Sequence, residues 1–206
     1  WLSGILGKNP QAANQIALNL SSMTFMVAIG LSVTAMIRVG NQKGLKRFRE
    51  LRRIAFSIFM VSTTFAILFA VLFYLFNTDL PKLYLDYNDP EKYADNFEVW
   101  SIASKLLLIA AVFQISDTIQ VVALGALRGM QDVKIPTFMT FVAYWLIGFP
   151  ISYYLSMYTD YKSSGIWIGL LAGLTSSGIM LFIRFNYLSK KMIVKNDLLN
   201  LKEQTA

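Results

Sequence analysis

Residues 54–78 read IAFSIFMVSTTFAILFAVLFYLFNT, a run of 25 residues without a charged side chain. The hydrocarbon core of a bilayer is about 30 Å thick, and a helix needs about 20 apolar residues to cross it. The run is continuous rather than alternating, which indicates a helix and not a strand of a barrel. This stretch alone predicts a transmembrane helix.

The rest of the chain repeats this pattern. Residues 9–37, 135–159 and 163–183 carry no charge over 29, 25 and 21 residues, and the apolar stretch 106–127 contains one acid, Asp117. We therefore predict an all-α, polytopic membrane helix bundle with five full transmembrane helices. The expected bounds of these spans are about residues 10–38, 45–76, 99–128, 135–158 and 164–188.

The two ends of the chain belong to the same transmembrane domain, which is expected to occupy residues 1–206. Residues 1–7 are interpreted as the end of a truncated sixth helix, with Asn9-Pro10 turning the chain into the next span. An ordered apolar N-terminal tail is the alternative. Residues 189–206 are expected to form a cytoplasmic tail.

The composition fits a membrane protein and argues against an enzyme. Hydrophobic residues make up 55% of the chain and charged residues 15%, whereas soluble domains carry about 25% charged residues. The chain has no His and no Cys, so it cannot form Ser-His, Cys-His, thiolate or His-metal sites. It also lacks a Walker-type phosphate loop. We expect no enzymatic activity and no cofactor.

The 19 Lys and Arg residues gather on one side of the predicted spans. Seven lie in residues 38–53, two in residues 128–134 and five from residue 184 onward, which places 14 of the 19 on that side. By the positive-inside rule the basic loops and the C-terminus are cytoplasmic, in the inner (plasma) membrane of the cell. The net charge of +7 is therefore attributed to contacts with anionic headgroups, and no nucleic-acid partner is expected.

Asp117 is the strongest candidate for a functional residue, because it is the one acid deep inside a span. A carboxylate in hydrocarbon is costly, and such residues usually face an internal cavity and mark an ion or proton path. Asp117 is thus predicted to bind a proton or a cation, with sodium as the possible metal ion. A hydrogen-bonded structural role is the alternative.

The neighbours of Asp117 suggest a polar cavity. Phe113, Gln114 and Gln120 lie at i−4, i−3 and i+3, on one broad face of the same helix. Each is predicted to line a cavity or to bind substrate.

The first full span carries its own polar stripe. Gln15 and Asn19, followed by Ser22, recur at helical spacing within an otherwise apolar helix. Gln15 and Asn19 are predicted to line the same cavity. For these residues, as for those beside Asp117, polar contacts that hold helices together are an equally plausible role.

Glycine and proline mark two further features. Gly165, Gly169 and Gly173 form one face of the last span, which permits close packing either within the bundle or in a dimer. In the fourth span, Gly148-Phe149-Pro150 predicts a kink, either static or acting as a hinge.

Several motifs together resemble one family. Residues 12–19, AANQIALN, and residues 30–35, GLSVTA, are similar to the two ends of the eighth helix of MATE (multidrug and toxic compound extrusion) exporters. Phe113-Gln114 with Asp117, followed by GALRG at residues 125–129, resembles the tenth helix and its inner turn. The resemblance extends over nearly the whole chain.

The resemblance implies a function. The full protein would have twelve helices in two lobes, and this chain would be the C-terminal lobe, whose partners are the N-terminal half, the bilayer and small cationic drugs. The family exports cationic, lipophilic drugs in exchange for sodium ions or protons. Asp117 aligns with the family's acid in the cation site of this lobe, and Gln15 with a polar position that faces the cavity.

The chain departs from the family pattern at two positions. The family's His is Asn14 here, and a frequent Tyr is Phe113, which removes a hydroxyl ligand from the cation site. The acidic partner of Asp117 would precede Trp1, so the chain alone is expected not to transport. Two alternative functions are a lipid-linked saccharide flippase of the same superfamily and a non-transporting membrane scaffold subunit.

Overall fold

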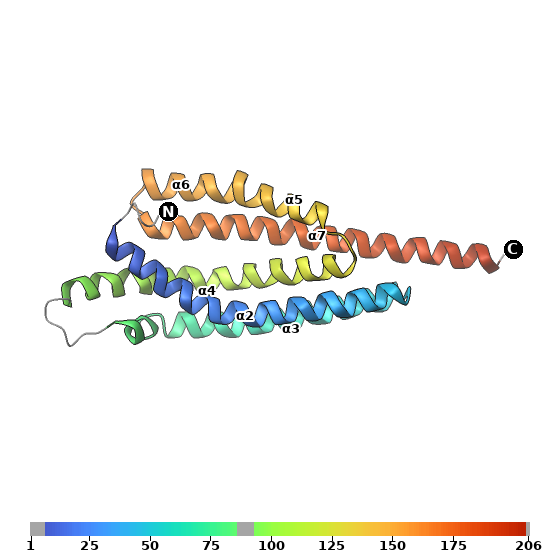
Figure 1. The fold of residues 1–206 in the computed structure, drawn as a ribbon, viewed down its shortest axis with the longest axis horizontal. Coiled ribbons are helices and arrows are strands. Elements are labelled where there is room, and N and C mark those ends of the chain that lie inside the picture. The colour runs from blue at the N-terminus through green and yellow to red at the C-terminus, as the bar shows by residue number, and fades with distance from the viewer. Residues whose placement is uncertain (1–6, 86–92, 205–206) are drawn as a thin grey trace.

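The computed structural model describes residues 7–85 and 93–204, which form a bundle of long helices (Figure 1). Its elements are α2 (Lys8–Gly44), α3 (Phe48–Leu75), the short 3-10 helix η1 (Leu80–Tyr84), α4 (Tyr93–Gly129), α5 (Lys134–Val142), the π-helix η2 (Ala143–Gly148), α6 (Phe149–Tyr158) and α7 (Lys162–Gln204). The segments α5, η2 and α6 follow one another as a single rod (Figure 1).

Five of these rods are long and apolar enough to cross a membrane. They are Lys8–Gly44, Phe48–Leu75, Tyr93–Gly129, Lys134–Tyr158 and Lys162–Leu199. The prediction of an all-α bundle with five spans is confirmed. The proposed end of a sixth helix falls, for residues 1–6, outside the described residues.

The helices extend past the charge-free runs from which the spans were predicted. α2 continues to Gly44, and α7 continues through the expected tail as far as Gln204. With 43 residues, α7 is about 65 Å long, roughly twice the thickness of the bilayer core. A charge-free run predicts the spanning segment of a helix but not its ends. Lys and Arg have good helix propensity, so a helix can continue through them beyond that segment.

α4 is the central helix of the bundle. Half of its most apolar window (50%) is buried, compared with 28% for α2, 22% for α3 and 39% for α7. Figure 1 shows α4 lying between α2 and α3 on one side and α7 on the other. The sequence thus places Asp117 on the most enclosed helix of the chain.

The glycine stripe of α7 packs inside the bundle. A Cβ atom at Gly165 or Gly169 would overlap the backbone of α6, and at Gly169 the obstacle is Ser152. Gly173 packs against Gly148 of η2, where a Cβ atom would make a tight contact of 3.1 Å with the Cα atom of Gly148. The described structure therefore uses this face for contact between neighbouring helices of one chain, and not as a dimer surface.

The fourth span is interrupted where the sequence predicts a kink. Residues Ala143–Gly148 are π-helical and lead directly into α6, whose first turn contains Pro150. Pro150 has no N–H to donate to the preceding turn, and the wider π-helical turn accommodates the loss of this hydrogen bond. This wider turn contains Tyr144, which faces α4.

An ion pair ties Arg184 of α7 to the turn after α4. Arg184 donates two hydrogen bonds to Asp132, from Nε at 2.5 Å and from Nη2 at 2.9 Å, and both side chains are less than one-fifth exposed. Bidentate arginine–carboxylate pairs are among the stronger ones, because both N–H groups are aligned with the carboxylate.

We expect Asp132→Asn to lower the free energy of unfolding by about 1–3 kcal/mol, because it leaves a largely buried guanidinium without its carboxylate. Thermal unfolding followed by circular dichroism in detergent micelles measures this. The matched control is Asp197→Asn, which breaks the exposed pair of Asp197 with Arg49 and should cost less than about 1 kcal/mol. Equal losses for the two variants would contradict the structural role of the Asp132 pair.

Candidate ion-binding site

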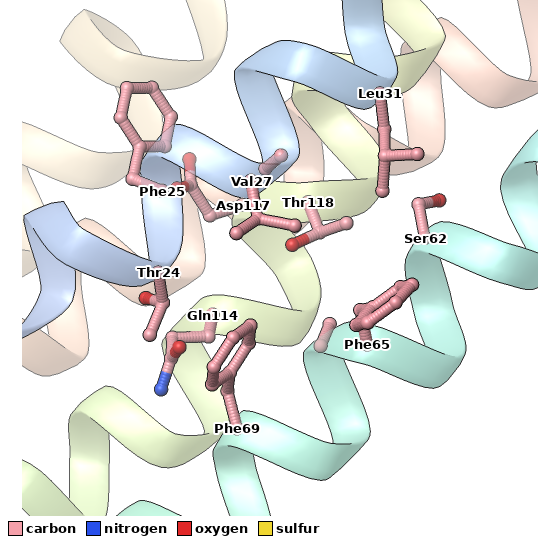
Figure 2. A pocket seen from close by; sticks show the side chains of 12 residues that line it. Thr24, Phe25, Val27, Leu31, Ser62, Phe65, Phe69, Gln114, Asp117 and Thr118 are labelled. Atoms are coloured by element: carbon pink, nitrogen blue, oxygen red, sulfur yellow. The ribbon is translucent and has the colours of Figure 1, made fainter.

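A small polar pocket lies between α2, α3 and α4, beside Asp117 (Figure 2). Its volume is about 10 Å³, room for about one water molecule. Its polar lining comes from three helices: Thr24 of α2, Ser62 of α3, and Gln114, Asp117 and Thr118 of α4. The remaining wall is apolar and includes Phe25, Leu31, Phe65 and Phe69.

Gln114 is the most unusual member of this lining. Its side chain is buried, with 5% of the residue exposed, and neither Oε1 nor Nε2 has a hydrogen-bond partner among the described residues. An unpaired buried amide costs about 1–3 kcal/mol, and native structures retain few of them. This amide therefore indicates a place where a ligand or water supplies the missing contacts.

Asp117 lies half-buried next to Gln114, and Figure 2 shows its side chain beside α2, close to Phe25 and Val27. In the described ranges, no hydrogen bond or ion pair reaches its carboxylate. Lys105 of the same helix is exposed. It lines a separate hollow near the start of α4, together with Asp95 and Glu98. Asp117 thus has no counter-charge in this part of the chain.

The hydroxyl groups of the pocket present oxygen acceptors. Thr24 Oγ1 donates its proton to the carbonyl of Ser21 at 2.8 Å, and Ser62 Oγ donates to the carbonyl of Phe59 at 3.0 Å. Their lone pairs therefore remain free for a cation or for a water that donates to them. The described lining holds no Lys or Arg, so the pocket suits a cation or a proton and not an anion.

The described residues contain no group of three or more acidic side chains that could hold a metal ion. One carboxylate surrounded by neutral oxygens supplies a single negative charge. Such a set matches a proton or a monovalent cation better than a divalent ion, which usually needs several carboxylates.

We expect Gln114→Leu to raise the free energy of unfolding by about 1 kcal/mol, because it removes a buried amide without a partner. Gln120→Leu, on the same helix, should lower it by about 1–3 kcal/mol, because Gln120 Oε1 accepts a hydrogen bond from Tyr144 Oη at 3.0 Å. Chemical unfolding of the two variants in mixed micelles measures both signs. A loss of stability in Gln114→Leu equal to that in Gln120→Leu would show that the Gln114 amide already has a partner.

The other predicted residues of α4 do not line this pocket. The ring of Phe113 packs on Trp167 of α7, with centroids 5.4 Å apart, and Gln120 turns toward Tyr144. Positions i−4 and i+3 lie on one side of Asp117 around the helix, whereas Gln114 at i−3 lies on the other. The structure thus brings Gln114 together with Asp117 and directs Phe113 and Gln120 toward α7 and η2.

Gln15 and Asn19 are also separate from the pocket. Both are exposed on α2, where Gln15 Nε2 donates to Asn19 Oδ1 at 3.5 Å. They make no side-chain hydrogen bond to another helix among the described residues. This polar stripe therefore faces away from the bundle that the chain forms, and its function as a cavity lining stays a prediction.

Sequence reasoning missed several polar members of the site. Thr24 and Ser62 resemble ordinary small polar residues of transmembrane helices, and nothing in the sequence distinguishes them. Thr118 could have been found from its position directly after Asp117. Sequence reasoning also missed that Asn14 Oδ1 accepts a hydrogen bond from Trp167 Nε1 at 2.9 Å. Asn14 stands where the resembled family has His, and here it anchors α2 to α7.

Comparisons with known proteins agree with this fold. The chain is 35% identical over 185 residues to a probable multidrug resistance protein NorM of Bacillus cereus, covering 90% of this chain and 39% of that protein. It is 40% identical over 191 residues to the multidrug resistance protein MdtK of Yersinia enterocolitica, covering 90% and 40%. The chain thus spans about two fifths of the length of these relatives.

Solved structures give the same result for the fold. The crystal structure of the eukaryotic MATE transporter AtDTX14 matches with a TM-score of 0.77 at 20% identity, over 93% of this chain and 42% of that one. A crystal structure of MATE in the bent conformation matches with a TM-score of 0.81 at 14% identity, over 94% and 42%. The model of the MatE family matches residues 1–154, and the chain belongs to the MatE family of multi-pass membrane proteins.

Proposed function

We propose that this chain is one lobe of a secondary active antiporter that exports cationic, lipophilic drugs in exchange for sodium ions or protons. The observation that carries the proposal is the pocket in which Asp117 adjoins the buried, unpartnered amide of Gln114. Relatives with multidrug resistance names support the substrate class. The partner would be an N-terminal lobe, since the chain matches about 40% of those relatives.

The size of the pocket separates the ion from the drug. A volume of about 10 Å³ admits one water-sized particle, whereas sites for drug-sized molecules measure about 300–1,000 Å³. The drug would therefore bind elsewhere, and our candidate for that surface is the exposed Gln15–Asn19 stripe, which would face the other lobe. Ion and drug would then be coupled through the conformation of the lobes and not by direct contact.

The chemistry of the pocket favours this function over the flippase alternative. A lipid-linked saccharide carries an anionic pyrophosphate, which requires basic residues in the cavity. The described lining offers one carboxylate, neutral oxygens and apolar groups. These features match a cation or a proton instead.

A dye-efflux assay tests the proposal. The chain is joined to the N-terminal lobe of a curated relative, expressed in cells that lack their own exporters, and loaded with ethidium. We expect the joined protein to extrude the dye and the 206-residue chain alone to leave it inside. A correctly inserted joined protein that exports no dye, or export by the chain alone, would refute the assignment of this chain as one lobe of a drug exporter.

A further inference from the structure

An apolar groove runs between α3 and α7 in the half of the bundle nearest the basic loops. It has a volume of about 580 Å³. Its walls are Phe56, Phe59 and Met60 of α3 and Ile179, Phe182 and Ile183 of α7. Met60 is 72% exposed and Ile183 61%, so the groove opens on the surface of the described chain.

The groove has few polar side chains, and one of them is already hydrogen-bonded within its own helix. Thr64 Oγ1 donates to the carbonyl of Met60 at 2.9 Å, within its own helix. Thr63 is the other polar residue of the lining. The groove therefore fits a hydrocarbon chain and offers little to a polar ligand.

Arg52 lies at the end of the groove nearest the basic loops. Its guanidinium is 4.9 Å from the centre of the Phe56 ring, and Phe56 lines the groove. It donates hydrogen bonds to Asn186 Oδ1 at 2.9 Å and to Ser189 Oγ at 3.0 Å. Both partners are neutral, and in the described part of the chain no carboxylate pairs with Arg52. A positive charge without an acidic partner thus stands at the mouth of the groove.

The rim around Arg52 adds further positive charge. Arg49 lies one turn before Arg52 on α3, and Lys190 lies one turn after Asn186 on α7. Arg49 pairs with Asp197 at 3.0 Å, but both side chains are exposed, so the pair leaves room for a competing anion. The rim therefore complements a phosphate group.

The distance along α3 from Arg52 to the far end of the groove is comparable to the thickness of one leaflet of a bilayer. From Arg52 to Thr64 the helix rises about 18 Å, and half of the hydrocarbon core measures about 15 Å. From this match we infer that the groove binds an anionic phospholipid, with an acyl chain along the aromatic wall and the phosphate at Arg52. Arginine is well suited to this contact, because its N–H groups can pair with two phosphate oxygens.

Native mass spectrometry of the complete chain, delipidated in non-ionic detergent, tests this site. The probes are phosphatidylglycerol and phosphatidylcholine with identical acyl chains. We expect phosphatidylglycerol to bind about tenfold more tightly, and Arg52→Gln to remove most of that preference. Thr63→Phe, which fills the groove, should weaken the binding of both lipids severalfold while leaving Arg52 in place.

The matched control is Arg53→Gln, which removes the same charge from an exposed neighbour that does not line the groove. We expect it to change phosphatidylglycerol binding less than twofold. Circular dichroism checks that each variant is folded, and Thr63→Phe decides the outcome if Arg52→Gln is not. Equal binding of the two lipids by the unaltered chain, equal effects of Arg52→Gln and Arg53→Gln, or a dimer that Thr63→Phe dissociates would overturn the inference.

Discussion

Asp117→Asn is expected to abolish drug export by the joined two-lobe protein, lowering the initial rate of ethidium efflux at least about a hundredfold. Asparagine keeps the size and the oxygen of the side chain but can neither carry a negative charge nor release a proton. If Asp117 holds the coupling ion, the variant has no way to use an ion gradient, and the loss should be close to complete. Efflux from preloaded cells, normalised to the amount of protein in the membrane, measures this.

The control for this experiment removes an acid outside the pocket. Asp160 lies exposed in the turn before α7 and lines the separate hollow to which Lys105 also contributes. Asp160→Asn changes the net charge by the same amount, and we expect its efflux rate to stay within twofold of the unaltered protein. Normal export by Asp117→Asn would make Asp117 a structural residue and would remove the basis of the proposed coupling site.

Gly125→Leu should give the largest loss of stability, more than about 3 kcal/mol, because it places a side chain where two helices touch. Even a Cβ atom at Gly125 would overlap the backbone carbonyl and the hydroxyl of Ser32 on α2. The same contact is fixed by a hydrogen bond from Ser32 Oγ to the carbonyl of Val121 at 2.7 Å. Since backbone atoms are in the way, α2 and α4 would have to separate.

Gly30→Leu provides the comparison, because a Cβ atom at Gly30 meets no other atom within 4 Å. Its effect should be neutral or slightly stabilising, since leucine favours helix over glycine by up to about 1 kcal/mol. Thermal unfolding of both variants in the same detergent measures the difference. Equal melting temperatures for Gly125→Leu and Gly30→Leu would contradict the close α2–α4 contact.

Much of the fold was predictable from the sequence, because the bilayer imposes a simple rule. A run without charge over more than 20 residues has few alternatives to a membrane-spanning helix. The ends of α2 and α7 were not predictable from that rule, since these helices continue past the apolar runs through residues such as Lys, Arg and Asn. The partner of the Gly165–Gly173 stripe depended on the packing of the bundle, which one sequence does not reveal.

The candidate site was predictable only in its centre. Asp117 stood out because an acid inside a span is costly, and Gln114 followed from helical spacing. Ser62 gave no signal, because its place in the pocket depends on the register between α3 and α4. The sequence also did not show that Gln114 and Gln120 point in opposite directions. Both lie within about 60° of Asp117 around the helix, but they face different neighbouring helices.

Proteoliposomes containing the joined two-lobe protein can show whether Asp117 holds the coupling ion. Ethidium transport is measured under an imposed sodium gradient, a proton gradient, or neither, for the unaltered protein and for Asp117→Asn. If Asp117 holds the coupling ion, at least one gradient should accelerate transport by the unaltered protein, and Asp117→Asn should respond to neither gradient. Gradient-driven transport by Asp117→Asn at the rate of the unaltered protein would contradict this role of Asp117.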